Sequence, residues 1–161
     1  MKRNVNIEKI YLITLILFIV DFFVKRIVVK YVDLFKKIEV IPKFFYISYV
    51  QNTGAAWSIL DNSTILLSVL SIVAFIIISS YLKKIKEFNK WKILAFGLLL
   101  GGILGNFIDR VMYGYVIDYL DFYIFGYNYP VFNIADMCIV VGAFMLIIDV
   151  IRGEKHERSS R

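Results

Sequence analysis

Apolar residues gather in four long runs along the chain, separated by polar or mixed segments. Each run holds about 20 residues, and a helix of that length crosses a hydrocarbon core of ~30 Å. The first run follows a basic leader, as in a signal peptide, but it lacks a small-x-small cleavage site and contains Asp21 and Lys25. The pattern predicts four retained transmembrane helices, at about residues 10–29, 63–82, 91–110 and 131–151.

Shorter patterns fill the segments between these runs. From Tyr31 to Ile38, apolar residues recur at i, i+3, i+4 and i+7, which predicts a short helix on the membrane surface. Val40 to Val50 is rich in β-branched and aromatic residues and predicts a strand, and a turn is expected at 52–54. Ala55 to Leu60 is expected to form a second strand or an interfacial segment. Segment 111–130 is dense in Tyr and Phe, as is typical of a loop in an interfacial aromatic belt.

The distribution of basic residues predicts the orientation in the membrane. The leader, the 83–92 loop and the tail at 152–161 are rich in Lys and Arg, whereas 111–130 contains neither. Basic loops stay in the cytoplasm, so both termini should be cytoplasmic, with loops 30–62 and 111–130 outside. Loop 30–62 does contain lysines, but four spans require both termini on one side. The charged tail is expected to be disordered.

Composition agrees with a single integral membrane domain over residues 1–161. The chain is 60% hydrophobic, with a mean hydropathy of +0.71, whereas soluble domains are about 45–50% apolar. The net charge is +6, but the basic residues lie beside the apolar runs, so we expect no nucleic-acid partner. The single cysteine, Cys138, excludes an intrachain disulfide.

The stretch from Gly101 to Asp136 holds a dense set of polar groups for so apolar a chain: Asn106, Asp109, Arg110, Asp118, Asp121, Asn133 and Asp136. Ionisable groups near lipid are costly, and are functional candidates by default. Helical spacing puts Asn106 and Arg110 on one face, and Asn133 and Asp136 on another. If those faces meet, they form one polar pocket near the outer surface. The alternative is that these groups only hold the bundle together by interhelical hydrogen bonds and an ion pair.

The types of residue present narrow the chemistry. The only histidine is His156, in the tail, so a histidine-assisted hydrolase has no base and a zinc site has no ligands at the pocket. No Gly-rich phosphate loop and no GxGxxG motif occurs. What remains is carboxylates, amides and one arginine, which suits an aspartic pair that shares a proton. We expect no metal and no cofactor. Gly97, Gly101, Gly102 and Gly105 are expected to pack the third helix closely against its neighbours.

Four motifs occur in order along the chain: QNTGAAWS (51–58), GNFIDR (105–110), VIDYL (116–120) and FNIAD (132–136). In this arrangement the chain resembles the bacterial lipoprotein signal peptidases, the signal peptidase II family. The resemblance implies four helices with a small extracytoplasmic β-sheet and loop that cradle the substrate. It implies a membrane aspartic endopeptidase, which cuts diacylglyceryl-modified prolipoproteins just before the lipidated cysteine. It implies that Asp118 and Asp136 are the catalytic pair, and that the residues lining the site are Asn52, Asn106, Arg110 and Asn133.

The expected partners are lipid-modified prolipoprotein signal peptides and membrane phospholipids, and the expected location is the bacterial cytoplasmic membrane, with the protein as a monomer. Asp21 and Lys25 are four residues apart and should form a structural pair, while Asp109 and Asp121 are left outside the catalytic set. Two other functions stay open. One is a small proton-coupled transporter that uses the same carboxylates as a relay, and the other is a lipid-binding scaffold without enzymatic activity.

Overall fold

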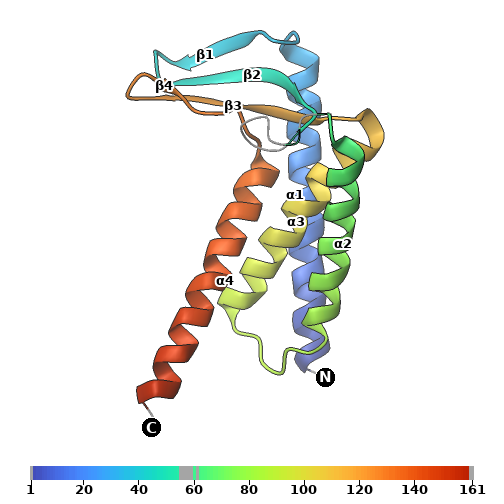
Figure 1. Cartoon of the computed structure of the whole chain (residues 1–161), viewed down its shortest axis with the longest axis vertical. Coiled ribbons are helices and arrows are strands. Elements are labelled where there is room, and N and C mark those ends of the chain that lie inside the picture. The colour runs from blue at the N-terminus through green and yellow to red at the C-terminus, as the bar shows by residue number, and fades with distance from the viewer. Residues whose placement is uncertain (1, 55–59, 61, 160–161) are drawn as a thin grey trace.

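The computed structural model describes residues 2–54, 60 and 62–159. Four helices form a bundle, and a small antiparallel sheet lies across one end of it (Figure 1). Both chain termini lie at the opposite end of the bundle. The helices are α1 (Lys2–Tyr31), α2 (Thr64–Leu82), α3 (Lys90–Tyr113) and α4 (Ile134–Ser159).

The helices lie where the apolar runs predict them, but several of their ends differ. Helix α1 is longer than the predicted first span at both ends, α3 continues to Tyr113, and α4 begins at Ile134. Because α4 continues to Ser159, the expectation of a disordered tail from residue 152 is wrong over that part. Among the described residues, three helical segments are long and apolar enough to cross a membrane, in α2, α3 and α4. The apolar run of α1 is interrupted by Asp21, Lys25 and Arg26.

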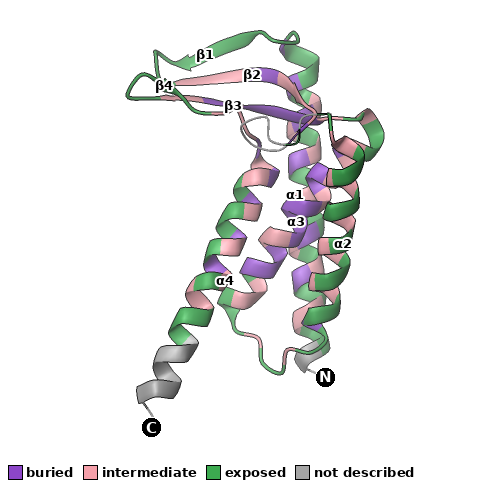
Figure 2. Ribbon diagram, viewed as in Figure 1, coloured by how far each residue is buried: buried purple, intermediate pink, exposed green. Residues whose placement is uncertain are grey.

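Helix α3 is at the centre of the bundle and packs against the other three helices. Figure 2 shows many buried residues along α3, whereas α2 is largely exposed or half-buried. Glycines make the close approach possible, because a Cβ at Gly97 would lie 2.5 Å from Ile13 and one at Gly101 2.9 Å from Leu17, both on α1. A Cβ at Gly102 would overlap the Ala135 carbonyl oxygen of α4. The predicted packing role of these glycines is confirmed.

Both ends of α3 are marked by capping residues. Asn89 accepts a hydrogen bond from the Lys92 backbone N–H at 2.8 Å, which caps the first turn. Gly114 follows the last turn with φ of 79°, and its N–H donates to the Arg110 carbonyl at 3.0 Å. A left-handed residue at this point suits glycine and ends the helix. The chain then turns directly into the sheet.

The sheet has four antiparallel strands in the order β1-β2-β3-β4. They are β1 (Lys37–Ile41), β2 (Phe45–Asn52), β3 (Val116–Ile124) and β4 (Tyr127–Asn128). A cluster of buried side chains joins the sheet to the last turns of α1: Val28, Val32, Tyr49, Ile117 and Tyr119. The small sheet that the family resemblance implied is therefore present, and it is held firmly to the helices.

Three expectations for the inter-helical segments are wrong. Residues 31–38 are not a surface helix, because Phe35 has φ of 60° and donates its N–H to the Tyr49 carbonyl of β2 at 2.9 Å. The single strand predicted at 40–50 is two strands, since Pro42 and Lys43, with φ of 58° at Lys43, form a turn between them. Segment 111–130 is not a plain loop but contains β3 and β4. The strand or interfacial segment expected at 55–60 falls mostly on residues 55–59, outside the described part of the chain.

Candidate active site

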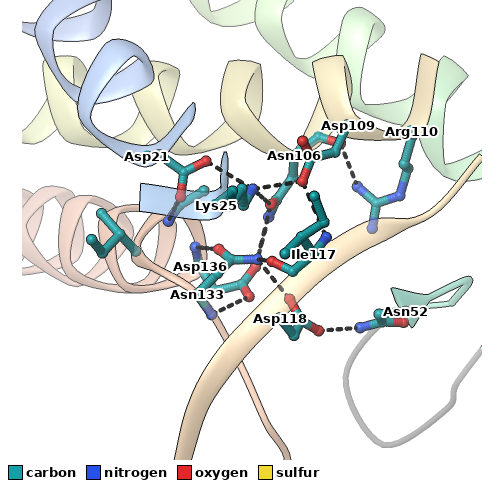
Figure 3. A network of polar contacts seen from close by, with 12 residues as sticks. Asp21, Lys25, Asn52, Asn106, Asp109, Arg110, Ile117, Asp118, Asn133 and Asp136 are labelled. Atoms are coloured by element: carbon teal, nitrogen blue, oxygen red, sulfur yellow. Dashed lines mark hydrogen bonds and ion pairs between the residues drawn. The ribbon is translucent and has the colours of Figure 1, made fainter. Parts of the chain in front are cut away.

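Two carboxylates from different parts of the fold meet below the sheet. Asp118 is in β3, and Asp136 is in the first turn of α4. Figure 3 shows both side chains in one network of polar contacts, with amide side chains around them. Asp118 was expected on a loop, because segment 111–130 was predicted to be one. A strand holds it more rigidly, because Asp118 is directly opposite Val50 of β2 in the sheet.

Asp136 is positioned by the sequence around the start of α4. Asn133 precedes the helix and accepts from the Asp136 backbone N–H at 2.8 Å, while the Asn133 backbone N–H donates to Asp136 Oδ2 at 3.2 Å. This reciprocal pair is a capping box, which satisfies two N–H groups that a helix start leaves free. The local segment from 133 to 136 thus fixes the direction of the Asp136 carboxylate as the helix forms.

Asn133 also joins the two carboxylates. Its Nδ2 donates to Asp118 Oδ1 at 2.7 Å, while its oxygen and backbone N–H are engaged with Asp136. The residue is fully buried, at 0% exposed. One rigid side chain therefore sets the relative placement of Asp118 and Asp136.

The remaining carboxylate oxygens are bound by two other amides. Asn52, at the end of β2, donates to Asp118 Oδ2 at 2.8 Å. Asn106, on α3, donates to Asp136 Oδ1 at 2.6 Å. All four oxygens of the pair thus accept an N–H, which stabilises negative charge on buried carboxylates.

Asp118 is only 2% exposed. Burial raises its pKa to about 7, and the negative charge of Asp136 acts in the same direction. The hydrogen bonds from Asn52 and Asn133 oppose that rise in pKa. At neutral pH the site therefore holds a carboxyl group that can both give and take a proton.

A buried ion cluster lies directly behind the pair. The Lys25 ammonium, 0% exposed, is 2.7 Å from Asp21 Oδ2 and 2.9 Å from Asp109 Oδ2. The predicted Asp21–Lys25 pair is confirmed. Lys25 also donates to Asn106 Oδ1 at 3.2 Å, so the cluster is linked to the site itself.

Arg110 is the cation at the open side of the site. Its Nη2 donates to the Gly54 carbonyl at 3.2 Å, and its Nη1 lies 3.5 Å from the Asn106 carbonyl. Its Nε is buried without a hydrogen-bond partner among the described residues.

A cavity of about 740 Å³ opens beside these groups. Its polar end is formed by Asn52, Asn106, Arg110, Asp118 and Asp136. The rest of its wall is mainly apolar and comes from α2, α3, α4 and the segment before α4, including Leu67, Leu70, Ala74, Ile103, Phe132, Met137 and Val140. The arrangement suits an apolar ligand with one polar, reacting group at its end.

A family model described as "Signal peptidase (SPase) II" matches residues 13–152 of this chain. The chain belongs to the signal peptidase II family. Two solved structures support the fold of this signal peptidase II chain, both described as bacterial membrane enzymes studied by the in meso method. One, at 2.3 Å resolution, has 35% identity and a TM-score of 0.85, over 91% of this chain and 90% of that one. The other, at 1.9 Å resolution, has 37% identity and a TM-score of 0.79, over 88% and 91%.

In this signal peptidase II chain, the six site residues named from the sequence lie in one network: Asn52, Asn106, Arg110, Asp118, Asn133 and Asp136. Asp121 lies apart from it and accepts from the Ser48 hydroxyl at 2.8 Å. Asp109, which was left outside the catalytic set, is connected to this network, since it binds Lys25 and the Ile117 backbone N–H. Sequence reasoning missed the link from Lys25 to the site. A basic residue within an apolar run, four residues after an aspartate, was the available signal.

Proposed function

We propose that this chain is a lipoprotein signal peptidase that cuts diacylglyceryl-modified prolipoproteins just before the lipidated cysteine, with Asp118 and Asp136 as its catalytic pair. The observation that carries the proposal is the bridge through Asn133, which holds both carboxylates at the polar end of an apolar cavity. The family supports a protease that acts on lipoprotein signal peptides. The aspartic chemistry and its residues are our own assignment.

In the proposed reaction the pair starts with one proton. We place that proton on Asp118, whose pKa is raised to about 7 by burial, and leave Asp136 as the carboxylate, where Asn106 and the Asn133 backbone donate to it. Asp136 takes a proton from a water molecule as the oxygen of that water attacks the scissile carbonyl carbon. At the same time Asp118 gives its proton to the carbonyl oxygen of the substrate. Asp136 then gives its proton to the amide nitrogen, and Asp118 takes back a proton from a hydroxyl of the tetrahedral intermediate as the C–N bond breaks. This releases the amine and the carboxylic acid and restores the starting protonation of the pair.

The cavity supports a substrate that is itself embedded in the membrane. A signal peptide is an apolar helix, and the diacylglyceryl group adds two acyl chains, both of which suit the apolar wall that α2 and α4 provide. Arg110 is a cation that lines the polar end of the cavity, so we assign it a substrate carbonyl or ester oxygen. Asn52 and Asn106 are assigned the positioning of the pair.

The proposed setting is the bacterial cytoplasmic membrane, with α1 as a fourth span beside α2, α3 and α4. Both termini lie at the end of the bundle away from the sheet (Figure 1), which agrees with four crossings. Lys and Arg near the termini and in the 83–92 loop support a cytoplasmic position for that end. The sheet and the site would then lie at the outer surface, and we expect a monomer.

The decisive experiment uses the purified chain in detergent with a synthetic diacylglyceryl-modified lipobox peptide and mass-spectrometric product analysis. We expect cleavage before the modified cysteine, and no cleavage by Asp118→Asn or Asp136→Asn. Asp121→Asn is the matched control, because it makes the same change in β3 at a carboxylate that binds Ser48 instead. Absence of cleavage by the folded wild type would overturn the proposal, as would full activity in either site variant. Proton flux into liposomes without cleavage would favour the transporter.

A further inference from the structure

Lys25 makes three contacts, and each partner in turn binds Asp118 or Asp136 or a residue next to one of them. Its ammonium has three N–H donors and no acceptor. It forms ion pairs with Asp21 Oδ2 at 2.7 Å and Asp109 Oδ2 at 2.9 Å, and it donates a hydrogen bond to Asn106 Oδ1 at 3.2 Å. Because Lys25 is 0% exposed, it cannot turn to water, and these three groups hold it in one place.

The first arm runs through Asp21 to the start of α4. Asp21 Oδ1 accepts from the Ala135 backbone N–H at 3.1 Å, while its other oxygen faces Lys25. Ala135 directly precedes Asp136, so this bond sets where the first turn of α4 stands relative to α1. The second arm runs through Asp109, whose Oδ2 accepts from the Ile117 backbone N–H at 3.1 Å. Ile117 directly precedes Asp118 in β3.

The third arm runs through Asn106. Its oxygen receives N–H groups from Lys25 and from Asn133, each at 3.2 Å, and its Nδ2 donates to Asp136 Oδ1 at 2.6 Å. In the reverse orientation of this amide, its NH2 group would face the ammonium and the Asn133 NH2. Lys25 thus selects the orientation in which Asn106 donates to Asp136.

We propose that Lys25 is a positioning residue of the active site. Its ammonium fixes the positions of Asp118 and Asp136 relative to each other, through its contacts with Asp109, Asp21 and Asn106. Figure 3 shows Lys25 between Asp21 and Asn106, on the far side of the pair from Asn52. The inference rests on the proposed function, because it takes Asp118 and Asp136 as the reacting groups. Lys25 itself does not touch the cavity: the residues that line it include Asn106 but not Lys25.

The test compares side chains at position 25, with the wild type as the reference. Lys25→Met keeps most of the length of the side chain but has no N–H donor. Each variant at position 25 also carries Asp21→Asn and Asp109→Asn, so that no unpaired carboxylate is left buried while an oxygen is kept for the Ala135 and Ile117 N–H groups. We expect kcat for the lipopeptide to fall roughly 10- to 100-fold, as small misplacements of reacting groups do, while KM changes by less than about threefold, since Lys25 is outside the cavity.

Two further variants separate positioning from simple stabilisation. Lys25→Gln returns one N–H donor in an uncharged, shorter side chain, and we expect its kcat to lie between those of the reference and of Lys25→Met. Thr14→Val is the matched structural control, because Thr14 is also buried on α1 and donates to α3, at the Gly97 carbonyl, 3.4 Å away and outside this network. Its unfolding temperature should fall while the kcat of the folded protein is unchanged.

A folded Lys25→Met variant with the kcat of the reference would overturn the inference, as would a loss confined to KM. If Lys25→Met does not fold, Lys25→Gln decides: a kcat loss of about threefold or more at unchanged KM supports positioning, and an unchanged kcat rejects it. These outcomes are distinct from failure of the proposed function, which would show as no cleavage by the wild type or as cleavage by Asp118→Asn.

Discussion

Asn133 and Asp136 cap each other at the start of α4: each accepts a hydrogen bond from the other's backbone N–H, at 2.8 and 3.2 Å. The same Asn133 holds Asp118 through Nδ2 at 2.7 Å. The Asn133 side chain therefore both caps the start of α4 and aligns the proposed catalytic pair. Substitutions at Asn133 can separate the two roles.

Asn133→Ser should keep the helix cap but lose the bridge, because a serine hydroxyl caps well and is too short to replace the amide at Asp118. We expect the unfolding temperature to stay close to that of the wild type while kcat falls on the order of 100-fold. Asn133→Ala should lose both, with an additional cost of about 0.5–2 kcal/mol in folding free energy. Thermal unfolding in detergent and lipopeptide cleavage measure the two effects. Equal unfolding temperatures for the serine and alanine variants would contradict the capping role.

The pH dependence follows from Asp118. If it donates a proton in the reaction, activity is lost as pH rises through its pKa of about 7. The Asn52 hydrogen bond favours the ionised form, so Asn52→Leu should raise that pKa and move the basic limb of kcat/KM to higher pH. Rates from about pH 5 to 9 would show the shift. A basic limb that moves to lower pH would argue against Asp118 as the acid.

Close contact between α3 and α4 is required for the Asn106–Asp136 bond. Gly102→Ala should push the helices apart, because the new Cβ would overlap the Ala135 carbonyl oxygen and lie 2.8 Å from Ile139. We expect strong loss of cleavage, with a lower unfolding temperature. Gly114→Ala is the control, since its Cβ meets nothing within 4 Å and costs only the strain of its φ of 79°, about 1 kcal/mol. Loss of activity in folded Gly114→Ala equal to that in Gly102→Ala would refute the packing explanation.

Arg110 should matter for substrate more than for the fold. Arg110→Ala removes the bond to the Gly54 carbonyl and the positive charge at the polar end of the cavity, and we expect kcat/KM to fall roughly 10- to 100-fold. Arg152→Ala makes the same change near the far end of α4, where the guanidinium lies 5.6 Å from the Trp91 ring centre, and should leave cleavage unchanged. Steady-state rates with the lipopeptide compare the two. Full activity in Arg110→Ala would remove this residue from the site.

Local patterns were enough to predict the helices and much of the site. Asn106 and Arg110 are one helical turn apart, as are Asn133 and Asp136, so their shared faces follow from spacing alone. The strand around Asp118 was not predicted, because aromatic residues suit both an interfacial belt and a sheet, and the pairing of β3 with β2 joins segments some 66 residues apart. The turn at Pro42 and Lys43 was missed because the surrounding run is rich in β-branched and aromatic residues, although Pro42 itself disfavours a continuous strand.

The role of Lys25 could not be predicted from spacing. Its pairing with Asp21 is local, but its contacts with Asn106 and Asp109 depend on how α1 packs against α3. That packing depends on glycines whose effect appears only when both helices are in place. A single sequence specifies such a contact but does not reveal it, since any of the polar groups on α3 could have met this lysine.

The capping box at the start of α4 also bears on when the enzyme becomes competent. Asp136 is aligned by Asn133 within its own turn, whereas Asp118 reaches it only through a sheet whose strands come from two distant segments. A chain whose helices are inserted but whose sheet has not docked would be unable to cut, so the first appearance of proteolysis during biogenesis would report the docking of the sheet.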